Sequence, residues 1–238
     1  MTKAMHRIQR KNKFLPYLLI LPSMLLFSMF TFYPFLKTIA LSFFLTDKRG
    51  NPTKWAGISN WVRVLSKETF WKVIAITLEI AGINLVFTFG LAIFFALLSS
   101  QKKKGGKLYQ TMYALPMAIA SSPAAAIFLF IFRQKNGVIN SILSFVHLPA
   151  LEIINTPWAI ILGMVYNFLP FMVLPIYNVL IKIDRDVINA ARDLGASSSY
   201  TFLKIILPLS IPGIISGITM VFVPALTTFV ISDLLGGG

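Results

Sequence analysis

Residues 14–36 read FLPYLLILPSMLLFSMFTFYPFL and contain no charged side chain. An α-helix rises about 1.5 Å per residue, so this run can cross the roughly 30 Å hydrocarbon core of a bilayer. The strict alternation of apolar and polar residues that marks a transmembrane β-strand is missing from it. A cleavable signal peptide is the alternative, but its apolar region is shorter, about 7 to 15 residues, and ends at a small-residue cleavage site. The sequence therefore predicts a retained membrane-spanning helix here.

Four further apolar runs follow, at residues 73–98, 111–132, 157–181 and 205–231. Of the 238 residues, 56% are hydrophobic and 13% are charged, and the mean hydropathy is +0.76, which excludes a soluble globular domain. We therefore predict an all-α, polytopic membrane protein with about five spans. Residues 1–13 form a basic tail, and the transmembrane domain covers residues 14–238.

The net charge of +14 comes from basic residues that cluster beside the apolar runs, which indicates membrane orientation rather than nucleic-acid binding. The tail and the segments 100–110 and 182–204 hold 13 of the 22 Lys and Arg residues, against 8 in the segments 45–72 and 133–155. Cytoplasmic loops carry the excess of Lys and Arg, so we expect a cytoplasmic N-terminus. The basic loops would lie beside anionic membrane lipids.

The chain offers few groups for catalysis. It has no cysteine, and its two histidines, His6 and His147, cannot by themselves build a typical catalytic zinc site. No G-x-x-x-x-G-K-[ST] phosphate loop occurs. A membrane-embedded enzyme would need clusters of ionisable groups, yet the spans contain one clear carboxylate and no histidine. We expect neither an enzyme nor a chain that binds a metal or cofactor itself.

The segment between the fourth and fifth spans, residues 182–204, reads KIDRDVINAARDLGASSSYTFLK. It is too polar to span a membrane but is rich in helix-forming residues. Its small side chains would let another protein approach closely. Composition alone leaves two interpretations open, a solvated amphipathic connector and a docking element for a partner.

The spacing within this segment favours the docking element. Asn189-Ala190-Ala191, then Gly195, then Ile205-x-Leu207-Pro208 resembles the EAA loop of binding-protein-dependent ABC importer permeases, the MetI-like family, spaced EAA-x3-G-x9-I-x-LP. Every interval matches. The acidic first position of the family is Asn189 here, and Asp186 and Asp193 lie about one helical turn to either side of it.

The resemblance implies a permease subunit in the bacterial plasma membrane, paired with a second, similar permease. Two ATPase subunits, which bind ATP and Mg²⁺, would dock on the cytoplasmic loops, and an extracytoplasmic binding protein would deliver the solute. Within the coupling loop 182–204, the helix around residues 183–196 would act as a lever that switches the spans from inward to outward access. The family implies six spans, so the chain is expected to be truncated before the last one.

The two halves of the chain resemble different branches of the family. Residues 1–145, with the motifs WAGISNW and GVIN, resemble sugar-type permeases, whereas residues 155–238 resemble spermidine/putrescine permeases. We therefore expect a hybrid sequence, with a sugar slightly favoured as the solute and a polyamine as the alternative. An ATPase-independent channel and an inactive truncated fragment are further alternatives.

Five residues of the spans are candidates for the solute path: Glu79, Asn84, Tyr166, Asn167 and Phe171. Glu79 would contact solute or a gate, or else pair with a basic residue of the partner permease. The two amides would line the path or form hydrogen bonds across helices. The two aromatic residues would stack on a sugar or attract a polyammonium ion, or simply pack between helices.

Overall fold

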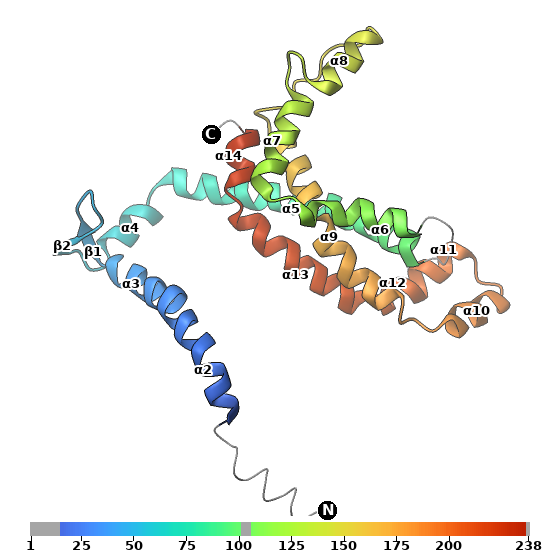
Figure 1. Ribbon diagram of the computed structural model, residues 1–238, viewed down its shortest axis with the longest axis horizontal. Coiled ribbons are helices and arrows are strands. Elements are labelled where there is room, and N and C mark those ends of the chain that lie inside the picture. The colour runs from blue at the N-terminus through green and yellow to red at the C-terminus, as the bar shows by residue number, and fades with distance from the viewer. Residues whose placement is uncertain (1–14, 101–105, 237–238) are drawn as a thin grey trace, which may run out of the picture. The chain divides into compact units, whose positions relative to one another are not determined.

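The computed structural model describes residues 15–100 and 106–236 and divides the chain into two compact units, residues 1–73 and 74–238. The boundary falls within helix α5 (Glu68–Ser100), and each unit is described by itself. Helices make up nearly all of the regular structure (Figure 1). The basic tail at residues 1–13 and the lysines at 102–104 lie outside the described residues.

One long helix dominates the first unit. It runs from Leu15 to Leu41 through α2 (Leu15–Phe27), the π-helical turn η1 (Ser28–Phe32) and α3 (Tyr33–Leu41). None of its residues is buried within the described chain, as expected for apolar side chains that face lipid. The predicted first span is confirmed as a helix and extends further toward its C-terminal end.

A small antiparallel hairpin follows, formed by β1 (Phe44–Thr46) and β2 (Pro52–Trp55). At its turn, one carboxylate oxygen of Asp47 accepts hydrogen bonds from the backbone N–H of Arg49 and of Asn51, both 2.8 Å long. The bonds from Asn51 hold the pKa of Asp47 below its ordinary value of 3.8. The all-α prediction missed this sheet, since strands of three and four residues leave no periodic signal.

The second unit is a bundle around the helices α5, α9 (Pro157–Leu180) and α13 (Ile211–Thr227). The shorter elements of the unit are α6 (Gly106–Ala114), η2 (Leu115–Ala118), α7 (Ser121–Phe132), α8 (Val138–Phe145), α10 (Arg185–Asp193), α11 (Ser198–Thr201), η3 (Phe202–Ile206), α12 (Leu207–Leu209) and α14 (Val230–Gly236). In Figure 1, α7 and α14 lie toward one end of α9, and α10 and α11 lie at the other.

Three helices are long and apolar enough to cross a membrane: Leu15–Leu41, Glu68–Ser100 and Pro157–Leu180. The predicted third span is bent by 109° between Leu108–Ala118 and Ser121–Phe132, because Ile119 and Ala120 adopt extended backbone conformations. Counting each bent pair as one span gives five. The predicted polytopic helical fold is therefore confirmed, but its third span is not straight.

The predicted fifth span is also broken. Ser198–Leu209 and Ile211–Thr227 meet at 66°. Pro208 and Pro212 flank this bend, and neither can donate a backbone hydrogen bond to the preceding turn. The helix then ends at Thr227 instead of continuing to residue 231, and α14 packs against α7 and α9.

Glycines set the contact between α9 and α13. A Cβ atom on Gly213 would lie 2.8 Å from the backbone oxygen of Pro175, and one on Gly217 would lie 2.6 Å from the sulfur of Met172. The two helix backbones therefore approach more closely than any larger residue would allow. The Gly213-x3-Gly217 pair therefore serves packing within this chain.

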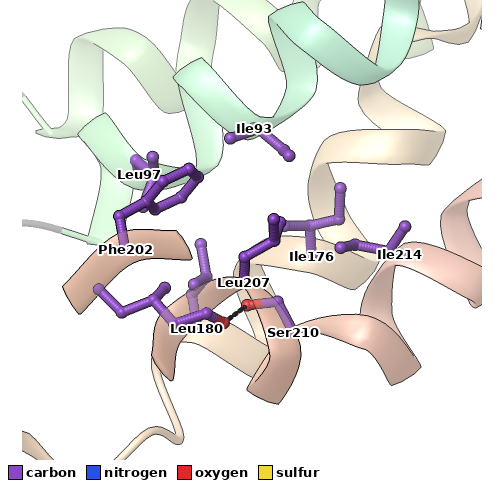
Figure 2. A pocket seen from close by; sticks show the side chains of 9 residues that line it. Ile93, Leu97, Ile176, Leu180, Phe202, Leu207, Ser210 and Ile214 are labelled. Atoms are coloured by element: carbon purple, nitrogen blue, oxygen red, sulfur yellow. Dashed lines mark hydrogen bonds between the residues drawn. The ribbon is translucent and has the colours of Figure 1, made fainter. Parts of the chain in front are cut away.

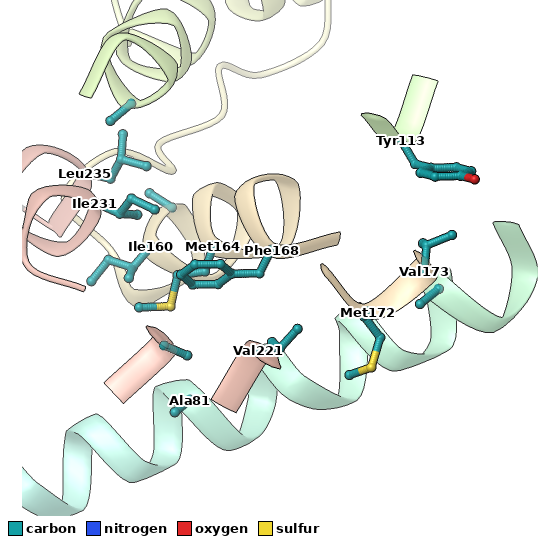
Figure 3. Packing of buried hydrophobic residues seen from close by; sticks show 14 of the residues in the cluster. Ala81, Tyr113, Ile160, Met164, Phe168, Met172, Val173, Val221, Ile231 and Leu235 are labelled. Atoms are coloured by element: carbon teal, nitrogen blue, oxygen red, sulfur yellow. The ribbon is translucent and has the colours of Figure 1, made fainter. Parts of the chain in front are cut away.

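A stripe of small and polar residues makes the buried face of α5: Ala81, Asn84, Thr88, Ala92, Ala96 and Ser99. The spacing of three or four residues places them on one side of the helix. Ala81 lies near Val221 and below α9 in Figure 3, and the apolar cluster continues through Met164, Phe168 and Met172 of α9. This side of α5 therefore meets the rest of the unit through small side chains.

Candidate functional site

The helix that carries the EAA-like motif is short and capped at both ends. At its start the side chain of Asp184 accepts a hydrogen bond, 3.0 Å long, from the backbone N–H of Asp186. This bond satisfies one of the amides that a helix N-terminus leaves free. Asp186 in the first turn and Arg192 in the last turn also suit the helix dipole. Local sequence therefore fixes α10 as a separate nine-residue element.

Gly195 ends α10 in a conformation that favours glycine. Its φ is +81°, its N–H donates to the oxygen of Arg192 at 2.9 Å, and the N–H of Ala196 donates to the oxygen of Ala191 at 3.0 Å. These two bonds form the Schellman motif, whose residue after the C-cap adopts the left-handed conformation. A Cβ on Gly195 would meet nothing within 4 Å. The glycine of the motif is therefore required by backbone geometry and not by space within this chain.

The exposed side of α10 is partly apolar. Val187, Ala190 and Leu194 follow one another at helical spacing, and Leu194 is 89% exposed. Asn189 and Asp193 are exposed beside them. Ala191, in contrast, is buried within the chain, so its side chain packs inside this unit and not on the exposed side of α10. Val187 and Leu194 therefore give this polar helix a small exposed apolar strip.

The last part of the motif lies at the bend before α13. Ile205 belongs to the π-helical turn η3, Leu207 begins α12, and Pro208 follows it. The buried hydroxyl of Ser210 donates to the oxygen of Ile206 at 2.7 Å, as Figure 2 shows, and so supports the break.

An apolar pocket of about 10 Å³ lies at this joint. Its walls come from three parts of the unit: Ile93 and Leu97 of α5, Ile176 and Leu180 of α9, and Phe202, Ile206, Leu207, Ser210 and Ile214 of the bent segment (Figure 2). A space of this volume holds about one water molecule and is too small for a solute. The joint therefore connects the motif to the bundle, and its pocket has no room for a solute.

Two of the five candidates for the solute path face α7. The amide nitrogen of Asn167 donates to the hydroxyl of Ser121 at 3.2 Å, and the ring of Tyr166 packs edge-on against Phe128 with centroids 5.2 Å apart. Both side chains are half-buried. Asn167 thus forms the hydrogen bond across helices that was one of its two predicted roles. Phe171, on the next turn of α9, packs against the apolar cluster.

The two candidates on α5 lie on different sides of that helix. Asn84 is completely buried, its oxygen accepts a 3.3 Å hydrogen bond from Thr88, and its amide nitrogen has no partner among the described residues. Glu79 is exposed and forms no ion pair within the described chain. It shares its side of the helix with Gly82 and Gly90, where an added Cβ would meet nothing within 4 Å. The structure therefore does not bring the five candidates into one cavity.

Asn140 holds together the connection between α7 and α9, a role that was not predicted from the sequence. The amide of Asn140 donates to the backbone oxygens of Arg133 and Leu151 at 3.2 and 3.0 Å, and its oxygen accepts from the N–H of Leu151 at 2.7 Å. A Cβ on Gly137 would lie 2.1 Å from the oxygen of Arg133. The GVIN motif, residues 137–140, is the sequence signal of this closed loop.

Comparison with known proteins decides the family. The profile of the binding-protein-dependent transport system inner membrane component family matches residues 88–238, which include α10, the joint and the whole EAA-like motif. The chain belongs to this family. It is accordingly a multi-pass membrane protein and a permease subunit of an ABC importer.

Relatives of both solute classes align with most of the chain. The spermidine/putrescine permease PotB of Escherichia coli is 34% identical over 216 residues, covering 88% of this chain and 76% of the relative. The trehalose/maltose permease MalF of Thermococcus litoralis is 28% identical over 237 residues, covering 98% and 80%. Neither match is confined to one half, so similarity to both classes does not require a hybrid sequence.

A solved structure shows the same fold. A chain of a bacterial alginate ABC transporter, crystallised with an alginate pentasaccharide-bound periplasmic protein, has a TM-score of 0.69 and 25% sequence identity. The match covers 86% of this chain and 69% of that one. The arrangement of helices described above is therefore that of an ABC importer permease.

Proposed function

We propose that this permease works beside a second permease, with its N-terminus in the cytoplasm and with α10 docked on an ATPase. Two ATPase subunits bind and hydrolyse ATP with Mg²⁺, and this chain binds no cofactor itself. An extracytoplasmic binding protein delivers a small polar solute, with a sugar favoured over a polyamine. The periplasmic protein bound to the alginate transporter supports that partner.

The geometry of α10 carries the proposal. Local hydrogen bonds fix both ends of α10. The helix exposes Leu194 on its outer side and contacts α11 of the same chain. From α11 the chain passes directly into the joint at Ser210, which touches α5 and α9. A displacement of α10 by a closing ATPase pair would therefore reach the spans through one short, bent segment.

Leu194→Asp tests the docking surface. A buried apolar contact near the centre of an interface commonly contributes enough affinity that its loss weakens binding at least about tenfold. We expect Leu194→Asp to remove ATPase co-purification while the chain still inserts in the membrane. Ser199→Asp is the matched control, because it adds the same charge to an exposed position of α11 in the same loop. Equal ATPase recovery from the two variants would contradict the assignment of α10.

The polar groups turned toward the bundle favour a neutral solute. Asn84, Thr88, Ser121 and Asn167 are uncharged hydrogen-bonding residues, and Tyr166 adds an aromatic face. Such groups suit sugar hydroxyls. Glu79, the carboxylate within the apolar part of α5, lies on the exposed side of that helix.

A polyamine permease is the second candidate. The similarity to PotB favours it, and so does Glu79 if the exposed side of α5 meets the path between two permeases. A polyammonium ion needs carboxylates or aromatic faces to replace its hydration. Removing the charge of Glu79 should therefore affect polyamine transport but not sugar transport.

A further inference from the structure

The first unit contains a pocket that transport does not explain. It has a volume of about 630 Å³, within the range of about 300–1,000 Å³ found for small-molecule sites. It lies where the first span ends, between α3, strand β1 and α4 (Ser59–Leu65). Apolar side chains of Leu41, Phe44, Leu45 and Val64 share its wall with polar ones of Thr38, Ser42, Thr46 and Asn60, together with Trp61 and Arg63.

Hydrogen bonds from α4 hold this pocket together. The amide nitrogen of Asn60 donates to the backbone oxygens of Ser42 and Phe44, both at 2.9 Å. The indole N–H of Trp61 donates to the hydroxyl of Ser42 at 3.1 Å. Trp55, at the start of the WAGISNW motif, packs its ring edge-on against Phe44 with centroids 4.9 Å apart. The motif therefore folds the chain back over the end of the span and forms the pocket.

Arg63 is the charged residue of the pocket wall, and it has no ion pair or hydrogen bond within the described residues. The two acidic groups of this unit are engaged elsewhere. Asp47 accepts hydrogen bonds within the hairpin turn, and Glu68 pairs with Lys72 at 2.8 Å. A guanidinium presents a planar fork of donors that matches phosphate oxygens. The pocket thus offers a free cation beside an apolar wall.

The surroundings place this pocket at the membrane–water interface. It adjoins the end of a long apolar helix, and Trp55 and Trp61 are both exposed beside it. Tryptophan concentrates at this interface, where one part of its ring system contacts lipid and the N–H reaches a polar partner. A ligand that reaches this position along the span must itself be amphipathic.

We propose that this pocket binds an anionic phospholipid, with the phosphate on Arg63 and the start of an acyl chain along Leu41 and Val64. The half-apolar wall suits a lipid better than a free phosphate ion. Bound lipid would fix the hairpin and α4 at the membrane surface. The proposal uses none of the residues assigned to the solute path or to the ATPase surface.

Native mass spectrometry of the full chain tests the proposal. The chain is purified from membranes and equilibrated with equal amounts of phosphatidylglycerol and phosphatidylcholine. We expect preferential retention of phosphatidylglycerol, reduced about tenfold in Arg63→Gln and less in Arg63→Lys, which keeps the charge without the fork. Arg49→Gln is the matched control, because it removes the same charge from the hairpin turn outside the pocket, and we expect a change of less than about twofold.

Several results would overturn the site. They are equal retention of the two lipids, equal effects of the Arg63 and Arg49 substitutions, and displacement of the lipid by millimolar inorganic phosphate. A photoactivatable phosphatidylglycerol added to membranes that contain the assembled transporter gives a second measurement that needs no substitution. We expect it to label the peptide of residues 38–64, and absence of that label would show that a protein partner covers the pocket instead.

Discussion

Gly195 occupies its place in the EAA-like motif for a reason that spacing does not reveal. From the sequence, the small size of this residue was expected to let another protein approach closely. The structure instead places Gly195 at φ +81° in the turn that ends α10. Alanine in this conformation costs about 1 kcal/mol or more, and asparagine tolerates it better. We expect Gly195→Ala to lower solute-stimulated ATPase activity of the assembled transporter and Gly195→Asn to retain most of it. The opposite order would show that side-chain size, not backbone conformation, selects glycine.

The charge of Glu79 distinguishes a sugar importer from a polyamine importer. It is an exposed carboxylate on an apolar span, so it must face a polar path or a partner's charge when the transporter is assembled. For a sugar importer we expect Glu79→Gln to leave sugar uptake within about twofold, since the amide keeps the shape and hydrogen bonding. Uptake of radiolabelled spermidine and of a sugar by the same cells is the measurement. Loss of spermidine uptake alone would establish the polyamine assignment.

The close contact between α9 and α13 leaves no room for a side chain at Gly213. At Gly213 an added Cβ would meet the backbone of Pro175 and Ile176 at 2.8 and 3.1 Å, and backbone atoms cannot yield as a flexible side chain can. We therefore expect Gly213→Ala to destabilise the detergent-solubilised chain by about 1–3 kcal/mol. Gly90→Ala is the control on α5, where the Cβ meets nothing and the change should be neutral or slightly stabilising. Similar melting temperatures for both variants would contradict the close contact.

The same elements show what the sequence could predict. Apolar length identified Leu15–Leu41, Glu68–Ser100 and Pro157–Leu180, because crossing a bilayer requires a long apolar helix. The bends of 109° and 66° were not predicted, since hydropathy carries no information about direction and proline is common in straight spans too. In α10 the end signals, Asp184 and Gly195, were present in the sequence and define the helix. The five candidate residues of the solute path do not lie in one cavity. The side of a span that each residue faces depends on helix packing, which the sequence does not show.

In the whole molecule, the EAA-like loop and the β1–β2 hairpin are expected on opposite sides of the membrane. If the helix Leu15–Leu41 and the helix Glu68–Ser100 each cross once, the hairpin and α4 lie between the first two spans. The bent fifth segment is entered from the loop that holds α10. If the bent pair Leu108–Phe132 and the helix Pro157–Leu180 also cross once each, an N-terminus in the cytoplasm puts Ser59 outside and Ser198 inside. This orientation agrees with the excess of Lys and Arg in the inner loops.

Single cysteines at these positions test the orientation directly. The natural chain contains no cysteine, and Ser59 and Ser198 are both exposed at the first residues of α4 and α11. A membrane-impermeant maleimide added to intact spheroplasts should label Ser59→Cys fully and Ser198→Cys only after permeabilisation. Labelling of Ser198→Cys alone in intact spheroplasts would reverse the orientation. In that case α10 would face away from ATP, which would remove it from contact with any cytoplasmic ATPase.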